Sequence, residues 1–543
     1  MARSVFSDPT HQWAVWVESR SDRLIVLLLL AAALLAYLLN LGHLPLRDWD
    51  EGLVAQVARE IAEAPPGSHT WLFPTLWDSP YYNKPPLVHN LVALAYQVGG
   101  VNEWTARLPG AVLSAASVPL LYGIGRDIFV RRLTALAGAA VYLAMLPVLR
   151  HGRLAMLDGA VLCFFLLLLL CLLRSRRNPN WALGVGVGFG LLCLSKGLIA
   201  LLLGAIALAF VAADAPRLLT SFRHWLGLLI GSLPAIAWYA AQGIHYGQDF
   251  WMVHLFDQAL DRINESVENN SGPPWFYLLE LLKYGFPWLI FLPIAVRELW
   301  GDRNRSWAKL VVIWGIGYLG VISIMDTKLP WYVIPIYPAL ALAIAPELTR
   351  LWDELPGRSP KRAPSLRYRR VLGGFFALLA IGGWAGCTYF GGFEGKPVLA
   401  ISLGALGLTM SAVTVLWVRR DRQCISVLIW GFYVSMLLFV SSDHWVWELG
   451  EDYPVKPVAE VIRSAAPPEE SILTSHGLNR PSLNFYSQHQ VIPANRRQLV
   501  QRWRNDETPY LLLDENSLTQ KAFESAKQLG SAEGWTLITR DRQ

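Results

Sequence analysis

The chain has 543 residues, of which 54% are hydrophobic and only 16% are charged. Soluble proteins carry about a quarter charged residues, so this composition excludes an ordinary soluble protein. Repeated apolar runs of about twenty residues indicate a polytopic α-helical membrane protein. The formal net charge of +6 comes from Lys and Arg in short loops, which argues against nucleic-acid binding.

Clusters of Lys and Arg between the apolar runs mark the cytoplasmic side of the membrane. Residues 86–100 are apolar but only about fifteen residues long, so we expect a juxtamembrane or partly inserted segment there. With the N-terminus in the cytoplasm, we expect about thirteen transmembrane helices and an external C-terminus. The predicted spans are 24–41, 107–125, 133–149, 159–173, 181–195, 197–213, 225–242, 274–296, 308–325, 331–348, 371–391, 397–418 and 424–441.

The composition becomes polar enough for a soluble domain near residue 442. Residues 458–465 and 499–503 are expected to be helical, and strands are expected at 472–474, 491–492, 510–513 and 535–539. Alternating helices and strands indicate a small α/β domain. Since it contains no catalytic motif, we expect it to cover or support the membrane part. The predicted division is a transmembrane domain at 1–441 and an α/β domain at 442–543.

The first long loop, within residues 41–106, contains an acidic pair, Asp50-Glu51. The pair begins an amphipathic helix, because apolar residues recur at helical spacing on one face (Val54, Val57, Ala58, Ile61), while the other face is polar (Gln56, Arg59, Glu60). Trp and Tyr nearby predict that this loop lies in the bilayer interface. Acidic side chains at a helix N-terminus stabilise the helix, so a purely structural role of the pair stays open.

Lys84 precedes two prolines that fix the local backbone, so its ammonium is a reasonable phosphate ligand. Charged residues at span ends are often interfacial anchors, and each single one can be read that way. Their convergence on one face of the membrane is more informative, because a cavity with charges of both signs suits a phosphorylated, lipid-linked substrate. The residues concerned are Asp50, Glu51, Lys84, Arg150, His151, Arg153, Asp158, Lys196, His254, Arg262, Asp326 and Lys328.

Several motifs resemble one known family: Trp49-Asp50-Glu51, Asn83-Lys84-Pro85-Pro86-Leu87, residues 103–109 (EWTARLP), Ser195-Lys196-Gly197 and residues 328–332 (KLPWY). They are similar to motifs of the protein O-mannosyltransferase-like membrane glycosyltransferases of the GT-C type. Within that superfamily, the lipid A 4-amino-4-deoxy-L-arabinose transferases are the nearest match. The resemblance covers residues 24–350 well. Relatives often carry an acid immediately before the loop lysine, where this chain has Asn83.

The resemblance implies transfer of a sugar, 4-amino-4-deoxy-L-arabinose, from undecaprenyl phosphate to lipid A. The reaction would occur at the periplasmic face of the bacterial inner membrane and confer resistance to polymyxin and cationic peptides. It also implies catalytic roles for Asp50 and Glu51. We expect a catalytic role for Asp158 as well, although this residue, which follows Arg150 and Arg153, could instead be an ion-paired structural acid. Substrate contacts are expected from Tyr82, Lys84, Arg153, Lys196, His254, Arg262, Lys328 and Tyr332.

The loop at 243–274 is long for a simple connection, and we expect a lid with Arg262 as a phosphate clamp. A divalent metal near His254 has no ligand spacing to support it, so no cofactor is required by the sequence. If the acceptor is a phosphate, Asp50 stabilises positive charge at the sugar or binds a sugar amine. If the acceptor is a protein or glycan hydroxyl, Asp50 can act as a general base.

A transporter or flippase of lipid-linked sugars is the alternative from another class. Transporters place ionisable groups near the middle of the membrane and often contain paired repeats. Here the middles of the spans are largely apolar and no repeat is apparent. The enzyme therefore remains the better interpretation of the sequence.

Overall fold

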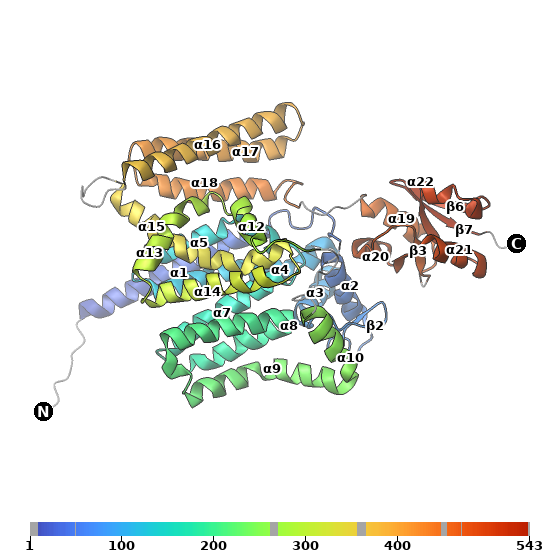
Figure 1. The fold of residues 1–543 in the computed structure, drawn as a ribbon, viewed down its shortest axis with the longest axis horizontal. Coiled ribbons are helices and arrows are strands. Elements are labelled where there is room, and N and C mark those ends of the chain that lie inside the picture. The colour runs from blue at the N-terminus through green and yellow to red at the C-terminus, as the bar shows by residue number, and fades with distance from the viewer. Residues whose placement is uncertain are drawn as a thin grey trace.

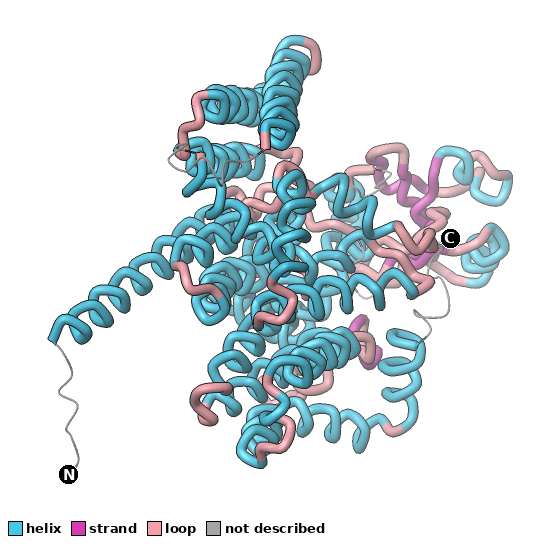
Figure 2. Tube along the Cα trace, turned by 60° about the vertical axis from the view of Figure 1, so that its left-hand side comes forward, coloured by secondary structure: helices cyan, strands magenta, loops and turns pink. Residues whose placement is uncertain are grey.

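The computed structural model describes residues 9–48, 50–260, 270–355, 365–446, 453–468 and 470–540. A bundle of long helices forms most of the molecule, and a small sheet-containing part lies at one end of the bundle (Figure 1). The first helix, α1 (Pro9–Leu38), extends from the opposite end of the bundle, as a second view also shows (Figure 2).

Ten helices in the described part of the chain are long and apolar enough to cross a membrane. Such helices satisfy all of their backbone hydrogen bonds internally, which the hydrocarbon interior requires. They are α1, α4 (Glu103–Ile128), α7 (Asp158–Ser175), α8 (Trp181–Asp214), α9 (Phe222–Tyr246), α14 (Ser306–Ile324), η5 with α15 (Pro330–Ile336, Tyr337–Glu354), α16 (Leu366–Gly392), α17 (Pro397–Val418) and α18 (Gln423–Val440).

Helix α8 reverses direction at Lys196, whose backbone angles are non-helical (φ −152°, ψ 72°). In a straight helix Phe189 and Gly204 would be about 22 Å apart along the axis. A Cβ atom at Gly204 would instead lie 2.7 Å from the ring of Phe189. The two halves therefore run antiparallel, and α8 supplies the two separate crossings that the sequence predicted.

Two further crossings are bent. Helices α5 (Arg132–Leu143) and α6 (Leu146–Gly152) meet at 62°, and α12 (Phe276–Tyr284) meets the segment of η4 (Trp288–Phe291) and α13 (Leu292–Gly301) at 107°. The sequence had indicated plain spans at both places. Counting each bent pair once and α8 twice gives thirteen crossings, as expected.

The basic clusters between the spans meet acids at one end of the bundle. Arg132 lies 2.8 Å from Asp22, and Arg176 lies 2.6 Å from Asp214. The second pair joins the end of α7 to the end of α8, which agrees with the reversal at Lys196. The sheet-containing part lies at the other end (Figure 1). Because Asp214 ends α8 and Lys196 separates its two antiparallel halves, Lys196 lies at the end of α8 away from the Arg176–Asp214 pair. The chain therefore separates its charged groups into two layers, one on each side of the apolar region.

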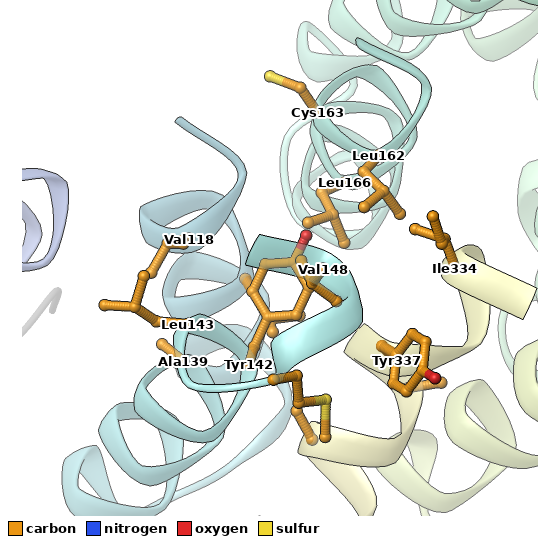
Figure 3. Close-up of a cluster of buried hydrophobic side chains, with 14 of the residues drawn as sticks. Val118, Ala139, Tyr142, Leu143, Val148, Leu162, Cys163, Leu166, Ile334 and Tyr337 are labelled. Atoms are coloured by element: carbon orange, nitrogen blue, oxygen red, sulfur yellow. The ribbon is translucent and has the colours of Figure 1, made fainter. Parts of the chain in front are cut away.

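A dense core lies where α4 to α7 meet η5 and α15. Tyr142 of α5 and Val148 of α6 are buried beside Leu162 and Leu166 of α7 (Figure 3). The Tyr142 hydroxyl is 2.9 Å from that of Ser117. Polar groups buried in such a core need a partner of this kind. This packing fixes the bend that carries the end of α6 toward the site described below.

The first loop forms α2 (Asp50–Glu63), a short hairpin of β1 (Thr75–Leu76) and β2 (Ser79–Pro80), and α3 (Leu87–Gly99). The amphipathic helix was predicted, but its polar face is not free at an interface. Gln56 and Arg59 are buried, and the Arg59 guanidinium donates a hydrogen bond to the carbonyl of Phe485 at 2.7 Å. The C-terminal part of the chain covers that face. Helix α3 is short, in agreement with a juxtamembrane segment.

The C-terminal part, which we call the C-terminal domain (residues 453–540 as described), contains a five-stranded sheet in the order β4-β3-β5-β7-β6. Strand β3 is parallel to β4 and β5, whereas β7 is antiparallel to β5 and β6. Its elements are α19 (Val455–Ala465), β3 (Ile472–Thr474), α20 (Pro481–Ser487), β4 (Val491–Pro493), α21 (Arg496–Asn505), β5 (Leu511–Asp514), α22 (Glu515–Leu518), η6 (Lys521–Phe523), β6 (Lys527–Ala532) and β7 (Trp535–Thr539).

The predicted strands and helices of this domain are all present, whereas β6, α20, α22 and η6 were missed. Strand β6 is largely exposed and has no buried apolar face that could reveal it. The exact boundary at residue 442 stays a prediction. The remaining short elements are η1 (Pro216–Leu218), α10 (Gln248–Trp251) and η2 (Met252–Leu260).

The two charged layers lead to a test of topology. A single cysteine at Asn178 should be shielded from a membrane-impermeant thiol reagent in intact spheroplasts, whereas one at Ser517 should react, because these residues lie at opposite ends of the bundle. The parent chain, with its five native cysteines, is the control for background labelling. Labelling at Asn178 and protection at Ser517 would reverse the proposed orientation.

Candidate active site

Asp50 is the first residue of α2, at the end of the bundle that faces the C-terminal domain. It remains partly exposed, yet protein surrounds most of it, and this burial raises the pKa of its carboxyl group. Lys196 and Lys84 act against that increase in pKa, whereas the negative charge of Asp158 adds to it. Loops far apart in sequence thus bring two ammonium groups and two carboxylates near one point.

Glu51, the second acid of the pair, is buried in the protein. Its carboxylate binds the Arg107 guanidinium at 2.8 and 2.9 Å and accepts backbone N–H groups of Arg47 at 2.9 Å and Ala155 at 2.6 Å. The Arg107 guanidinium holds the pKa of this carboxyl below its ordinary value against the opposing effect of burial. Both oxygens are therefore occupied, which favours a structural role for Glu51, and its expected catalytic role stays a prediction.

Asp158 and Lys196 form an ion pair near Asp50. The Lys196 ammonium lies 3.0 and 3.3 Å from the two carboxylate oxygens of Asp158. Asp158 begins α7, where a negative charge is favourable, and Lys196 occupies the tip between the two halves of α8. The reversal of α8 is what brings this lysine to the site instead of leaving it in the middle of a long helix.

Lys84 enters from the first loop, just before α3. Its ammonium donates a hydrogen bond to the Gln258 side-chain oxygen at 2.9 Å. Gln258 belongs to the segment 252–260, part of the loop that was expected to form a lid. No sequence pattern singled out this glutamine, because a lone Gln in a loop carries no periodic signal.

A cavity of about 210 Å³ connects these groups to the membrane region. Lys84, Lys196 and Tyr332 lie at its wall together with Gln258, while the rest of its lining is mainly apolar. The apolar lining comes from the second half of α8 and from α14: Leu198, Ile199, Leu201, Leu202, Val321, Ile322 and Met325. A cavity of this kind suits a molecule with an anionic head and a hydrocarbon tail.

His254 also lines the cavity, but both of its ring nitrogens are near protein groups. Nδ1 lies 2.8 Å from the carbonyl oxygen of Tyr82, and Nε2 lies 3.2 Å from the Tyr239 hydroxyl. The Tyr82 ring packs edge-on against Tyr246. These contacts join the first loop to the 252–260 segment. Among the residues that the structure describes, no group of three His, Cys, Asp or Glu could hold a metal ion.

Two expected substrate ligands are instead used to hold the fold. Arg153 donates hydrogen bonds to backbone carbonyls of Ala36 at 2.7 Å and Leu39 at 2.6 Å, at the end of α1. Lys328 donates to the carbonyls of Ser323 at 2.8 Å and Ile322 at 3.1 Å, at the end of α14. Carbonyls at a helix C-terminus have no partner within the helix and attract cations. Arg262 lies outside the described residues.

The buried Glu51–Arg107 pair predicts a large effect on stability. Arg107→Ala leaves the Glu51 carboxylate buried without its counter-charge, which costs about 3–5 kcal/mol. We expect a clearly lower midpoint of thermal unfolding in detergent. The matched control is Arg463→Ala, which breaks an exposed pair with Glu460 and should leave the midpoint nearly unchanged. Equal midpoints for the two variants would contradict the structural role of Glu51.

Comparisons with known proteins agree with this architecture. The profile of the dolichyl-phosphate-mannose-protein mannosyltransferase family matches residues 83–239. An undecaprenyl phosphate-α-4-amino-4-deoxy-L-arabinose arabinosyl transferase of Pectobacterium carotovorum subsp. carotovorum (strain PC1) is 29% identical over 395 residues, 71% of this chain and 65% of that protein. A transferase of the same name from Pseudomonas fluorescens (strain Pf0-1) is 30% identical over 343 residues, 60% of this chain and 59% of that one. The chain thus spans just under two thirds of the length of such relatives.

Solved structures show the same fold. ArnT from Cupriavidus metallidurans, crystallised with undecaprenyl phosphate, superposes with a TM-score of 0.76 at 18% identity, covering 95% of this chain and 97% of ArnT. The archaeal oligosaccharyltransferase AglB from Archaeoglobus fulgidus gives 0.52 at 13% identity, covering 92% of this chain and 70% of AglB. The chain is therefore similar in sequence to these arabinosyl transferases, and it has the fold of ArnT and AglB.

Proposed function

We propose that this protein transfers 4-amino-4-deoxy-L-arabinose from undecaprenyl phosphate to a phosphate group of lipid A, at the periplasmic face of the inner membrane. The observation that carries the proposal is the cavity in which Lys84 and Lys196 lie above an apolar lining, beside Asp50. An undecaprenyl chain matches the lining, and its phosphate matches the two ammonium groups. The names of the relatives supply the sugar.

In the proposed reaction, an oxygen of the lipid A phosphate attacks the anomeric carbon of the sugar. The bond from that carbon to the donor phosphate oxygen breaks, and its electron pair leaves with undecaprenyl phosphate. The leaving phosphate gains one negative charge, which Lys84 and Lys196 stabilise. The attacking oxygen is already anionic, so no proton needs to be removed from it.

Asp50 then acts through its charge. Positive charge develops on the sugar as the bond to the leaving group stretches, and a nearby carboxylate stabilises it. A sugar amine is a second group that the same carboxylate can bind. Asp158 is held by Lys196, so its proposed part is to fix that ammonium beside the donor phosphate.

The function is tested by mass spectrometry of lipid A. Cells that contain the protein, supplied with the donor lipid, should carry lipid A species with the added aminopentose. Cells without the protein should lack these species. Lipid A that is unmodified in both strains would contradict the proposed acceptor. If a sugar is then found on a protein or glycan hydroxyl, that hydroxyl is the acceptor instead.

Lys84→Ala should lower the transfer rate about 10²–10³-fold, because a charge that stabilises the leaving phosphate is lost. The fold should persist, since the side chain is only partly buried. The control is Lys396→Ala, which removes a lysine paired with Glu394 in the connection between α16 and α17. Transfer by purified Lys84→Ala at the wild-type rate would contradict the role of Lys84.

The pH dependence of transfer tests Asp50. The ionised carboxylate is the active form, and burial raises its pKa, so activity is present above that raised pKa and lost as the pH falls through it. The wild-type rate should therefore decline as the pH falls through this raised pKa, at a higher pH than an exposed Asp would give. Asp50→Asn should be slow and should lack this decline, measured with defined donor and acceptor. The same decline in Asp50→Asn would assign the titration to another group.

A further inference from the structure

The C-terminal domain holds the chain two residues before Asp50. The Asp48 carboxylate lies 2.6 Å from Nε of Arg480 and accepts the backbone N–H of Ser482 at 3.1 Å. It also accepts the Ser482 hydroxyl hydrogen. The side chains of Asp48 and Arg480 are 6% and 4% exposed. A buried carboxylate with three donors is a rigid attachment, not a transient surface contact.

Arg480 is fixed within its own domain as well. Its guanidinium stacks over the ring of Tyr453 at 4.1 Å and donates a hydrogen bond to the Tyr453 carbonyl at 3.3 Å. Arginine suits such a place because its planar group can stack and bind a carboxylate together. The cation that binds Asp48 is therefore held in place by the domain that carries it.

The same domain packs directly on α2. A Cβ atom at Gly52 would lie 2.6 Å from backbone atoms of Pro481 and Ser482, so the start of α20 touches α2 beside Asp50. About two turns further along the helix, Arg59 lies over the Phe485 ring at 4.0 Å. Any larger residue at Gly52 would push these backbones apart. The domain thus contacts the helix at its first turn and again near its middle.

The membrane part holds the other side of Asp50. Glu51, the next residue, is bound by Arg107 of α4 and by the backbone of Ala155. Asp50 therefore lies between one attachment to the C-terminal domain and one to the helical bundle. Its position relative to Lys84 and Lys196 depends on both attachments.

We propose that Arg480 is a positioning residue, through which the C-terminal domain sets the place of the Asp50 carboxylate by binding Asp48. The inference rests on the proposed transferase function, in which Asp50 acts on the sugar. A displacement of about 1 Å in a reacting group can cost about 10²-fold in rate. A domain without a catalytic motif of its own thereby becomes part of the catalytic apparatus.

Donor binding and positioning can be separated experimentally. The cavity that contains Lys84 and Lys196 is lined by residues 83–84, 196–202, 254–258, 318–325 and 332, and none of these belongs to the C-terminal domain. Loss of the Asp48–Arg480 contact should therefore lower the turnover of bound donor and leave the binding of the donor phosphate intact. Simple unfolding would lower both.

The experiment compares purified Arg480→Ala, Arg480→Lys and Gly52→Ala with the wild type. Turnover of the aminoarabinose donor should fall about 10²-fold in Arg480→Ala. It should recover to within about 10-fold in Arg480→Lys, which keeps the charge. Gly52→Ala should also lose turnover, although alanine favours the helix itself. Affinity for undecaprenyl phosphate, measured by native mass spectrometry, should change by no more than about 2-fold in all three, because the binding groups are unaltered.

Arg502→Ala is the matched control. Arg502 also forms an ion pair, with Glu470 at 2.9 Å, but this pair is partly exposed and lies entirely within the C-terminal domain. Its turnover should equal that of the wild type. Wild-type turnover in both Arg480→Ala and Gly52→Ala would overturn the inference. Affinity for undecaprenyl phosphate that falls as much as turnover does in these variants would overturn it as well. A wild-type protein that binds undecaprenyl phosphate but transfers no aminoarabinose would instead refute the proposed function.

Discussion

The bidentate pair between Glu51 and Arg107 joins the first loop to the helical bundle. A charge buried this deeply is tolerated only with a counter-charge and hydrogen bonds, and here both oxygens of the carboxylate are occupied. Arg107 also donates to the carbonyls of Leu41 and Leu44, so the start of the loop is fixed by the same group. Trp445, at the end of the last span, lies over its guanidinium at 5.3 Å. The direction of α2 depends on this pair, and the location of Asp50 depends on it together with the contact between Asp48 and Arg480.

The site around Asp50 combines attachments of different kinds. Lys84 reaches it from the first loop, Lys196 from the tip of α8, and Asp158 orients Lys196. On the side of the bundle these groups lie at the head of an apolar cavity, and on the opposite side the C-terminal domain binds Asp48. Charges of both signs near one point, each held by a separate element, are typical of preorganised sites that stabilise charge as it develops in a reaction. The arrangement also explains why a domain without reactive residues lies so close to the chemistry.

The membrane explains why most of the fold could be predicted from the sequence. A single segment of chain can cross the hydrocarbon region only as a helix, because a helix satisfies all of its own backbone hydrogen bonds. The length and apolarity of each span can therefore be recognised directly in the sequence. The reversal of α8 was predicted because Lys196 interrupts two apolar runs, each long enough to cross. The bends between α5 and α6 and between α12 and η4 were not predicted, because packing against neighbouring helices sets an angle that hydropathy does not encode. Strand β6 was missed for a related reason, since its exposed residues show no apolar alternation.

The sequence alone determined the class of protein, the number of crossings, the α/β character of the C-terminus and the group of charged residues that converge on one face. Only the tertiary structure showed which protein groups bind each of those charges. Glu51, Arg153 and Lys328 look like Asp50 and Lys84 in the sequence, but their partners are Arg107 and the backbone carbonyls at the ends of α1 and α14. A charged side chain is neutralised by whichever groups lie within about 3 Å of it. For Glu51 and Arg153 those groups come from distant segments, which only the folded chain brings together.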